Sequence, residues 1–176
     1  MKNWHDISYL EKGDSVQKKV YHAIVNSRLM KTLADFDPVL TGTYPIGIYL
    51  PESDLDVICQ FVNPEHFTTV LEIAFSSKKN FEIKTKEIRG QESIIARFNF
   101  ENFLFEIFGQ LLPVREQYAY RHMLIEARIL EENDDAFRSS IVRLKEKGLS
   151  TEEAFAFLLK IEGDPYDSLV SYSAEY

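Results

Sequence analysis

The chain has 176 residues, 45% hydrophobic and 13% aromatic, which suits one globular domain, and its single cysteine, Cys59, excludes a disulfide framework and a cysteine-based zinc site. Twenty basic and twenty-eight acidic residues give a formal net charge of -8, which argues against binding along a long nucleic acid. No secretory leader pattern opens the chain and no stretch approaches the roughly 18 apolar residues of a membrane helix, so we expect a cytoplasmic protein without membrane contact.

The first third of the chain alternates between helix and strand patterns. Apolar residues at helical spacing predict a helix over 15–33, with Asp14 or Ser15 as its N-cap. A short strand over 38–41, a turn at Gly42 and a loop lead to a second strand over 54–61.

Asn63 and Pro64 open another helix, expected to run to about residue 79. Three β patterns follow, over 81–88, 94–100 and 103–109. Glu101 and Asn102 fit a tight hairpin turn between the last two, which predicts an antiparallel second part of the sheet.

From Pro113 onward the pattern is helical, with Ser150 and Glu153 forming a capping box. The predicted helices cover 115–132, 135–147, 151–161 and a short piece after Pro165. Because no flexible linker separates them from the β-rich part, we expect a single domain over 1–176, with an α/β core over 1–112 and a helical C-terminal extension over 113–176.

Two carboxylates, Asp54 and Asp56, begin the strand predicted over 54–61. A strand repeats every two residues, so both acids would share one face. Placing like charges side by side on a largely buried strand is unfavourable unless a cation or hydrogen-bond donors compensate. A divalent metal ion is the simplest explanation.

Glu106 is the sole charged residue of the β pattern over 103–108. If Glu101 and Asn102 form a two-residue turn, Arg97 falls opposite Glu106. One interpretation is a structural ion pair between these two residues. The other, which we favour because three acids outnumber one arginine, places Glu106 beside Asp54 and Asp56 as an oxygen-only site for Mg²⁺ or Mn²⁺.

The turn at Gly42 and Thr43 supplies a second element of phosphate chemistry. Glycine lets a phosphate approach the backbone, and a hydroxyl with exposed N–H groups can hold its oxygens. Most Gly-Thr turns bind no phosphate, so this turn indicates a phosphate site only in combination with Asp54, Asp56 and Glu106.

Together these residues resemble the DNA polymerase beta-like nucleotidyltransferase superfamily over about residues 38–109. The resemblance begins with a Gly-Thr turn after a strand, which a spacer of ten residues separates from the string Asp54-Leu55-Asp56-Val57. The third part is the later string Phe105-Glu106-Ile107. The whole chain is similar to a small bacterial family of unknown function within that superfamily, judging by GTYPIGI, SDLDVIC, FEIFGQ and QYAYRHMLIE.

The resemblance implies an α+β fold, a mixed β-sheet packed by helices. It implies Asp54 and Asp56 as metal ligands, Glu106 as the third carboxylate and Gly42 with Thr43 as phosphate holders. The chain departs from the pattern at Thr43, where serine is commoner, and in the three residues that follow, which are neither small nor basic.

Further polar residues are candidates for nucleotide binding. Lys84 and Lys86 share a strand face and could hold phosphates, although charge on an exposed strand is usually only solvated. Arg121 and His122 lie on the polar side of the helix predicted over 115–132, where a His122–Glu126 hydrogen bond is the alternative. Two more residues complete the predicted binding set: Ser53 and Arg97.

The sequence therefore predicts a magnesium-dependent nucleotidyltransferase that moves a nucleoside monophosphate from a nucleoside triphosphate to the hydroxyl of a small-molecule or protein acceptor. Asp54, Asp56 and Glu106 would be its catalytic residues. The alternatives are a catalytically inactive binding module of the same fold and a purely structural interaction domain.

Overall fold

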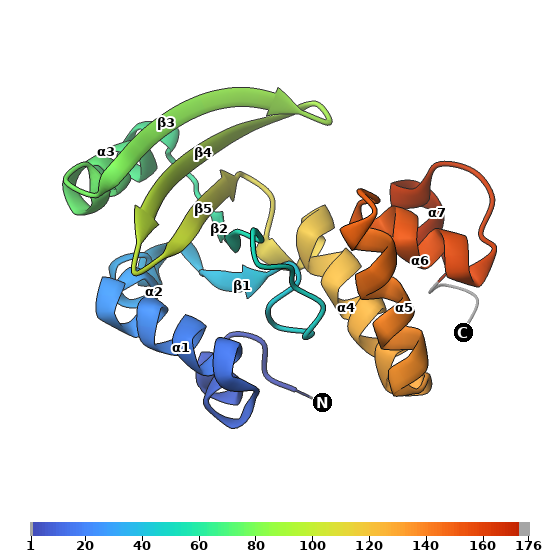
Figure 1. The fold of residues 1–176 in the computed structure, drawn as a ribbon. Helices are drawn as coiled ribbons and strands as arrows, with labels where there is room; N and C mark the ends of the chain where they lie inside the picture. Colours follow the sequence, from blue (N-terminus) through green and yellow to red (C-terminus); the bar gives the residue numbers. More distant parts are fainter. Residues whose placement is uncertain (1, 173–176) are drawn as a thin grey trace. The chain divides into compact units, whose positions relative to one another are not determined.

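The computed structural model describes residues 2–172, which cluster into two compact units (Figure 1). The first unit combines Met1–Thr41 with Asp54–Gln117, and the second combines Gly42–Ser53 with Tyr118–Tyr176. The single domain over 1–176 stays a prediction, and the end of that range, 173–176, lies outside the described residues.

The first unit is built on a five-stranded mixed sheet with the strand order β1-β2-β5-β4-β3. Only β2 and β5 pair in parallel, and the other neighbours are antiparallel. The predicted α+β class and the antiparallel second part of the sheet are confirmed. The strands are β1 (Val39–Thr41), β2 (Leu55–Gln60), β3 (Lys79–Ile88), β4 (Gln91–Phe100) and β5 (Phe103–Gln110).

The turn between β4 and β5 is the predicted two-residue hairpin turn. Glu101 and Asn102 both have positive φ values, 46° and 67°, as a type I′ turn requires. Phe100 therefore pairs with Phe103, and the register of the hairpin follows from this turn.

Two predictions for the helices of this unit differ from the structure. The helix expected to run to about residue 79 ends at Phe75, and the helix expected over 15–33 is interrupted at Arg28. Asp14 caps α1 by accepting the N–H groups of Val16 and Gln17, as predicted. Arg28 then adopts a left-handed conformation, φ 58°, which ends α1. The α-helices here are α1 (Ser15–Ser27), α2 (Leu29–Thr32) and α3 (Pro64–Phe75), with 3-10 turns at Ile7–Lys12, Ala34–Phe36 and Val114–Glu116.

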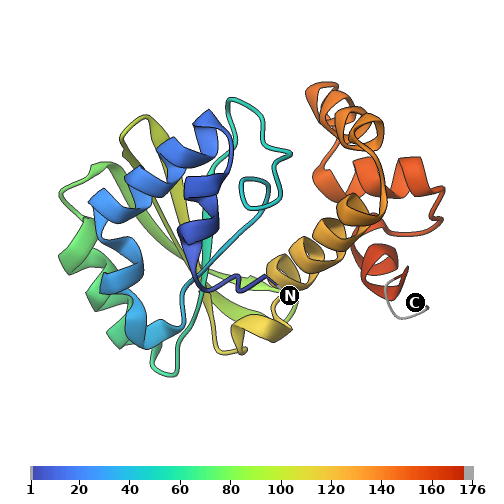
Figure 2. The same ribbon diagram turned by 90° about the horizontal axis from the view of Figure 1, so that it is seen from below.

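These helices cover one face of the sheet and form the core with it (Figures 1 and 2). Phe98 stacks between Phe75 of α3 and Phe105 of β5, with ring centroids 4.8 and 5.1 Å apart. Gly109 gives room to the ring of Phe67, since a Cβ at this position would lie 2.3 Å from it. The face that carries Phe98, Phe105 and Gly109 is thus the buried face of the sheet.

In its described part, up to residue 172, the second unit contains four helices and the segment 42–53. Ser150 and Glu153 form the predicted capping box at the start of α6. The helix predicted from residue 115 begins later, at Tyr118, because Gln117 is extended. The helices are α4 (Tyr118–Glu132), α5 (Asp135–Glu146), α6 (Thr151–Leu159) and α7 (Pro165–Tyr172). Within residues 2–172, no helix combines the length and the apolar character needed to span a membrane.

Candidate functional site

A row of polar side chains crosses the sheet of the first unit from one edge to the other. Directly paired residues of neighbouring strands project to the same face of a sheet. The strand register connects one residue of each strand in this way, and we call these five residues the polar row: Thr41, Asp56, Glu106, Arg97 and Glu82. The row lies on the face opposite Phe98 and Phe105, because Arg97 and Glu106 are the direct sequence neighbours of those core positions and the register puts the other members on their face.

Asp56 and Glu106 are direct neighbours within this row. They are paired across the parallel strands β2 and β5 although they are fifty residues apart in sequence. Both are only partly exposed. The structure therefore places Glu106 beside Asp56, while the role expected of Asp54, Asp56 and Glu106 as a three-carboxylate site stays a prediction.

Arg97 binds Glu106 from the other side of the row. Its Nε and Nη2 groups both donate to Oε2 of Glu106. This hydrogen bond and the charge of Glu106, with smaller contributions from Asp54 and Glu82, raise the pKa of Arg97 above its ordinary value. The structural ion pair, one of the two interpretations left open by the sequence, is thus formed.

The three predicted metal ligands do not form a ready metal site. In the part of the chain that the structure describes, no group of three or more His, Cys, Asp or Glu residues is arranged to hold a metal ion. The donor set of Asp54, Asp56 and Glu106 has the right chemistry for a hard cation, since it contains only carboxylate oxygens. Its arrangement differs from the expectation because the guanidinium of Arg97 already neutralises Glu106.

The predicted phosphate-binding turn belongs to the second unit. Gly42 has a positive φ of 74°, which a glycine adopts without strain. The Thr43 hydroxyl lies 3.4 Å from the Ser53 hydroxyl, which in turn accepts the N–H of Leu50. These bonds close the segment 42–53 on itself and hold the hydroxyls of Thr43 and Ser53 side by side.

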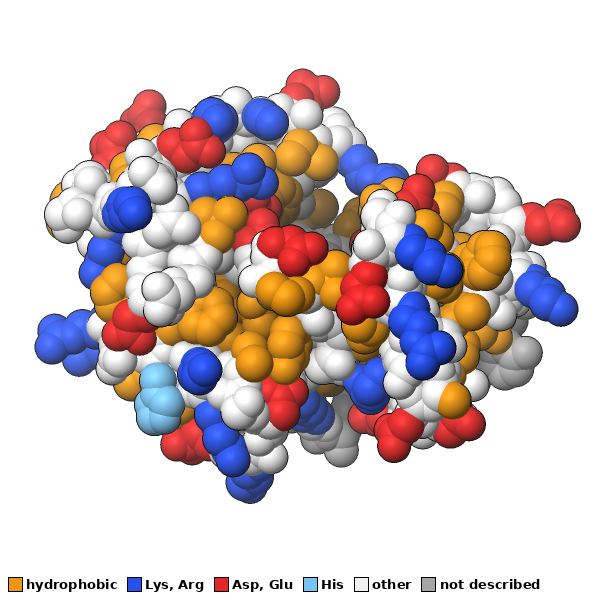
Figure 3. Space-filling model, viewed as in Figure 1, with side chains coloured by type: hydrophobic (Ala, Val, Ile, Leu, Met, Phe, Trp, Pro, Cys, Tyr) orange, Lys and Arg blue, Asp and Glu red, His pale blue; other side chains and the backbone are white. Residues whose placement is uncertain are grey.

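The two lysines of β3 are exposed on the face of the polar row. Lys84 forms an ion pair with Glu82 at 2.7 Å, and hydrogen bonding to Lys84 lowers the pKa of Glu82. Figure 3 shows acidic and basic side chains mixed over the region where Figure 1 places β3, without a continuous basic surface. A phosphate-binding role of Lys84 and Lys86 stays a prediction.

His122 of α4 is buried, only 4% exposed, and is not bonded to Glu126 as the alternative for this helix assumed. Its Nδ1 lies 3.2 Å from Glu152 and its Nε2 lies 2.8 Å from the carbonyl of Tyr166. Because both ring nitrogens face acceptors, the imidazolium form fits this geometry. Burial lowers the pKa of His122, but the hydrogen bonds to Glu152 and Tyr166 outweigh it and the pKa is raised.

Glu126 lies one helical turn from His122, and the sequence analysis considered it only as a hydrogen-bond partner of that histidine. Burial, with the charge of Glu152, raises its pKa to about 8. Its Oε1 has no hydrogen-bond partner among the described residues. Glu152, on another helix, could not be linked to this cluster from the sequence, because only tertiary packing brings α6 beside α4.

The fold is similar to that of solved nucleotidyltransferase structures. The Cid1 poly(U) polymerase with bound MgGTP matches with a TM-score of 0.56 and 16% identity, covering 79% of this chain and 46% of that chain. Cid1 with the UTP analogue UMPNPP gives 0.53 and 17%, covering 79% and 44%. A cytoplasmic RNA terminal U-transferase gives 0.50 and 17%, covering 73% and 39%.

The chain thus spans less than half the length of these proteins, and at this identity the likeness concerns the fold. It shows a nucleotidyltransferase-like fold, while membership of that superfamily and of the small bacterial family within it stays a prediction. No curated protein matches the sequence. The model of one family matches residues 22–172, and the chain belongs to that family, which is described as a domain of unknown function (DUF4269).

Proposed function

We propose that this protein transfers a nucleoside monophosphate from a nucleoside triphosphate to a hydroxyl group of a small-molecule or protein acceptor. The observation that carries the proposal is the pairing of Asp56 with Glu106 on adjacent parallel strands. Two acids fifty residues apart are thereby neighbours on one face of a nucleotidyltransferase-like sheet.

Mg²⁺, or Mn²⁺, is the cofactor in this proposal. Asp54 and Asp56 would be its ligands, and Glu106 would be the third ligand once Arg97 leaves its carboxylate. When bound, the ion would neutralise the charge that develops on the leaving pyrophosphate.

The reaction is a substitution at the α-phosphorus of the triphosphate. The hydroxyl oxygen of the acceptor bonds to this phosphorus, and the bond from it to the oxygen shared with the β-phosphate breaks, so that pyrophosphate leaves. The hydroxyl proton passes to a carboxylate oxygen of Glu106 or Asp56, which act as the general base.

The phosphate-binding roles in this proposal belong to the remaining candidates. Gly42, Thr43 and Ser53 supply backbone N–H groups and hydroxyls to the triphosphate. Four further candidates supply positive charge to the triphosphate: Lys84, Arg97, Arg121 and His122. The net charge of -8 favours a small or proteinaceous acceptor over a long polynucleotide, in contrast to the poly(U) polymerases of similar fold.

The test is incubation of the protein with labelled triphosphates, Mg²⁺ and candidate acceptors. Asp56→Asn should lower labelling at least about 100-fold, because it removes a proposed metal ligand and base while keeping the size of the side chain. Asp35→Asn is the matched control, since Asp35 is exposed and lies outside the polar row. Equal labelling by wild type and Asp56→Asn would refute the mechanism.

The ion pair between Arg97 and Glu106 favours a second candidate function, a catalytically inactive module that binds nucleotides. Such a module should gain stability from a nucleotide without any turnover. At a nucleotide concentration 100 times the dissociation constant the gain is about 2.7 kcal/mol, which a thermal-shift series with and without Mg²⁺ detects. A purely structural domain would show no shift with any nucleotide.

A further inference from the structure

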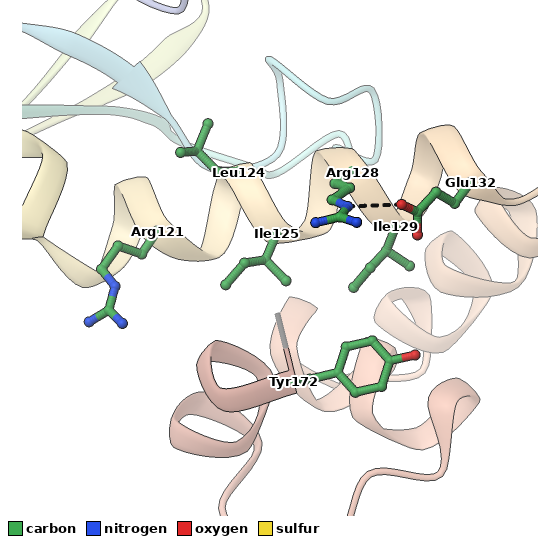
Figure 4. A pocket seen from close by; sticks show the side chains of 7 residues that line it. All are labelled: Arg121, Leu124, Ile125, Arg128, Ile129, Glu132 and Tyr172. Carbon is green, nitrogen blue, oxygen red and sulfur yellow. Dashed lines mark hydrogen bonds and ion pairs between the residues drawn. The ribbon is translucent and has the colours of Figure 1, made fainter. Parts of the chain in front are cut away.

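A groove of about 310 Å³ lies in the second unit, along α4 and beside the end of α7 (Figure 4). Its volume is at the lower end of the roughly 300–1,000 Å³ typical of small-molecule sites. The α4 residues that line it recur at three- and four-residue spacing and so form one stripe of the helix. The lining residues are Arg121, Leu124, Ile125, Arg128, Ile129, Glu132 and Tyr172.

The centre of the groove is apolar. Figure 4 shows Ile125 and Ile129 pointing from α4 toward the ring of Tyr172 on α7. The exposed lining is more apolar than polar. A ligand with a hydrocarbon or aromatic body would therefore lose unfavourable contact with water on entering it.

The charged residues of the groove leave one excess positive charge. Arg128 is paired with Glu132, with Nε and Oε1 2.8 Å apart, so these two side chains neutralise each other. Arg121 has no carboxylate partner within residues 2–172, and its guanidinium carbon lies 5.8 Å from the ring centroid of Tyr118. A guanidinium that has no carboxylate partner and lies beside an apolar surface is suited to a carboxylate, sulfonate or phosphate group, which it can bind with two parallel hydrogen bonds.

We propose that this groove binds a small organic anion, with the acidic group on Arg121 and an apolar body between Ile125, Ile129 and Tyr172. The inference does not depend on nucleotidyl transfer, since all the lining residues belong to the second unit, and it gives Arg121 a ligand other than the triphosphate named under the proposed function. It gives the helical part of the chain a ligand site of its own.

The probe for the test is 8-anilinonaphthalene-1-sulfonate, an aromatic anion whose fluorescence rises on binding. Its matched neutral counterpart is N-phenyl-1-naphthylamine, which has the same ring system without the sulfonate. The proteins compared are the full chain, Arg121→Gln, Ile125→Gln and the control Arg143→Gln, which changes an exposed arginine of α5 outside the groove. Circular dichroism verifies that each variant is folded.

The wild type should bind the anion at one site that octanoate displaces. Arg121→Gln should weaken binding of the anion at least about tenfold, as expected for loss of a charge-assisted hydrogen bond, and leave binding of the neutral probe within about twofold. Ile125→Gln should weaken both probes, and Arg143→Gln neither.

Three results would overturn the proposal. The first is equal affinity of wild type and Arg121→Gln for the anion. The second is equal loss for Arg121→Gln and Arg143→Gln, which would indicate a general charge effect. The third is binding that appears only in a chain ending at Tyr172, which would assign the groove to the chain's own last residues.

Discussion

The buried carboxyl group of Glu126 should make the stability of the protein depend on pH, and Glu126→Gln should remove this dependence. Glu126 is only 3% exposed. Burial and the charge of Glu152 raise its pKa to about 8, against smaller opposing effects of His122 and Lys145. The folded chain therefore keeps a proton on Glu126 at neutral pH, whereas the unfolded chain, with the ordinary pKa of 4.5, has released it.

The size of the effect follows from the two pKa values. In the window between about pH 4.5 and 8, the folded state binds one proton more than the unfolded state, so the free energy of unfolding falls as the pH rises. The loss is about 1.4 kcal/mol per pH unit, or about 3 kcal/mol between about pH 5 and 7. Glutamine has no proton to release, so Glu126→Gln should gain stability relative to wild type by this amount over the same interval.

The other titrating members of the cluster do not change this comparison. The raised pKa of His122 stabilises the folded state at low pH, and this stabilisation is lost as the pH rises through the pKa of the folded state. The lowered pKa of Glu152 acts in the opposite direction, because its stabilisation is lost as the pH falls. Both residues are present in wild type and in Glu126→Gln. Their contributions largely cancel in the difference between the two proteins, which reports Glu126 together with its electrostatic coupling to His122 and Glu152.

The measurement is urea unfolding followed by circular dichroism, at several pH values between about 5 and 8. Glu131→Gln is the matched control, because Glu131 is an exposed residue of the same helix and its replacement should change stability by less than about 0.5 kcal/mol at every pH. If the difference between Glu126→Gln and wild type were constant over this range, the carboxyl group would not be protonated in the folded protein and the reasoning would be refuted.

Three further substitutions test the packing and the anchoring of the fold. Gly109→Ala should destabilise the protein by about 1–3 kcal/mol in urea unfolding, because the added Cβ would lie 2.3 Å from Phe67, and adding Phe67→Leu should recover part of the loss. Ser150→Ala removes the acceptor that caps α6 and should cost about 1 kcal/mol, whereas no loss in the same assay would contradict the capping box. Lys145→Met removes the Nζ that donates to the carbonyl of Ile48 in segment 42–53, and should cost about 1–3 kcal/mol. It should also speed proteolysis within that segment, so an unchanged cleavage rate would count against this anchor.

The hairpin and the neighbourhood of Glu106 could be predicted from a local turn signal together with the resemblance. Two residues of positive φ at Glu101 and Asn102 fix the hairpin register, and that register alone places Arg97 opposite Glu106. The resemblance then supplied the expectation that Glu106 lies beside Asp56, and the parallel pairing of β2 with β5 brings the two residues together. No local pattern could have supplied that pairing, since it joins residues fifty positions apart.

Features that depend on long-range packing were missed or predicted differently. The sequence left open whether Arg97 or a metal ion neutralises Glu106, because both interpretations are compatible with the same hairpin register. In the structure, Arg97 forms the ion pair with Glu106. His122 was expected to bond within its own helix, but its partners, Glu152 and Tyr166, come from α6 and α7. The end of α1 at Arg28 was missed because arginine rarely adopts a left-handed conformation.

The anchoring of segment 42–53 has a consequence for biosynthesis. Arg138 and Lys145 donate to the carbonyls of Ile46 and Ile48, across sequence separations of 92 and 97 residues. At roughly 5–20 residues translated per second, the segment leaves the ribosome about 5–20 s before its anchors exist. The second unit is therefore completed late in translation, and a nascent chain that stops before α5 would expose this early segment to chaperones and proteases.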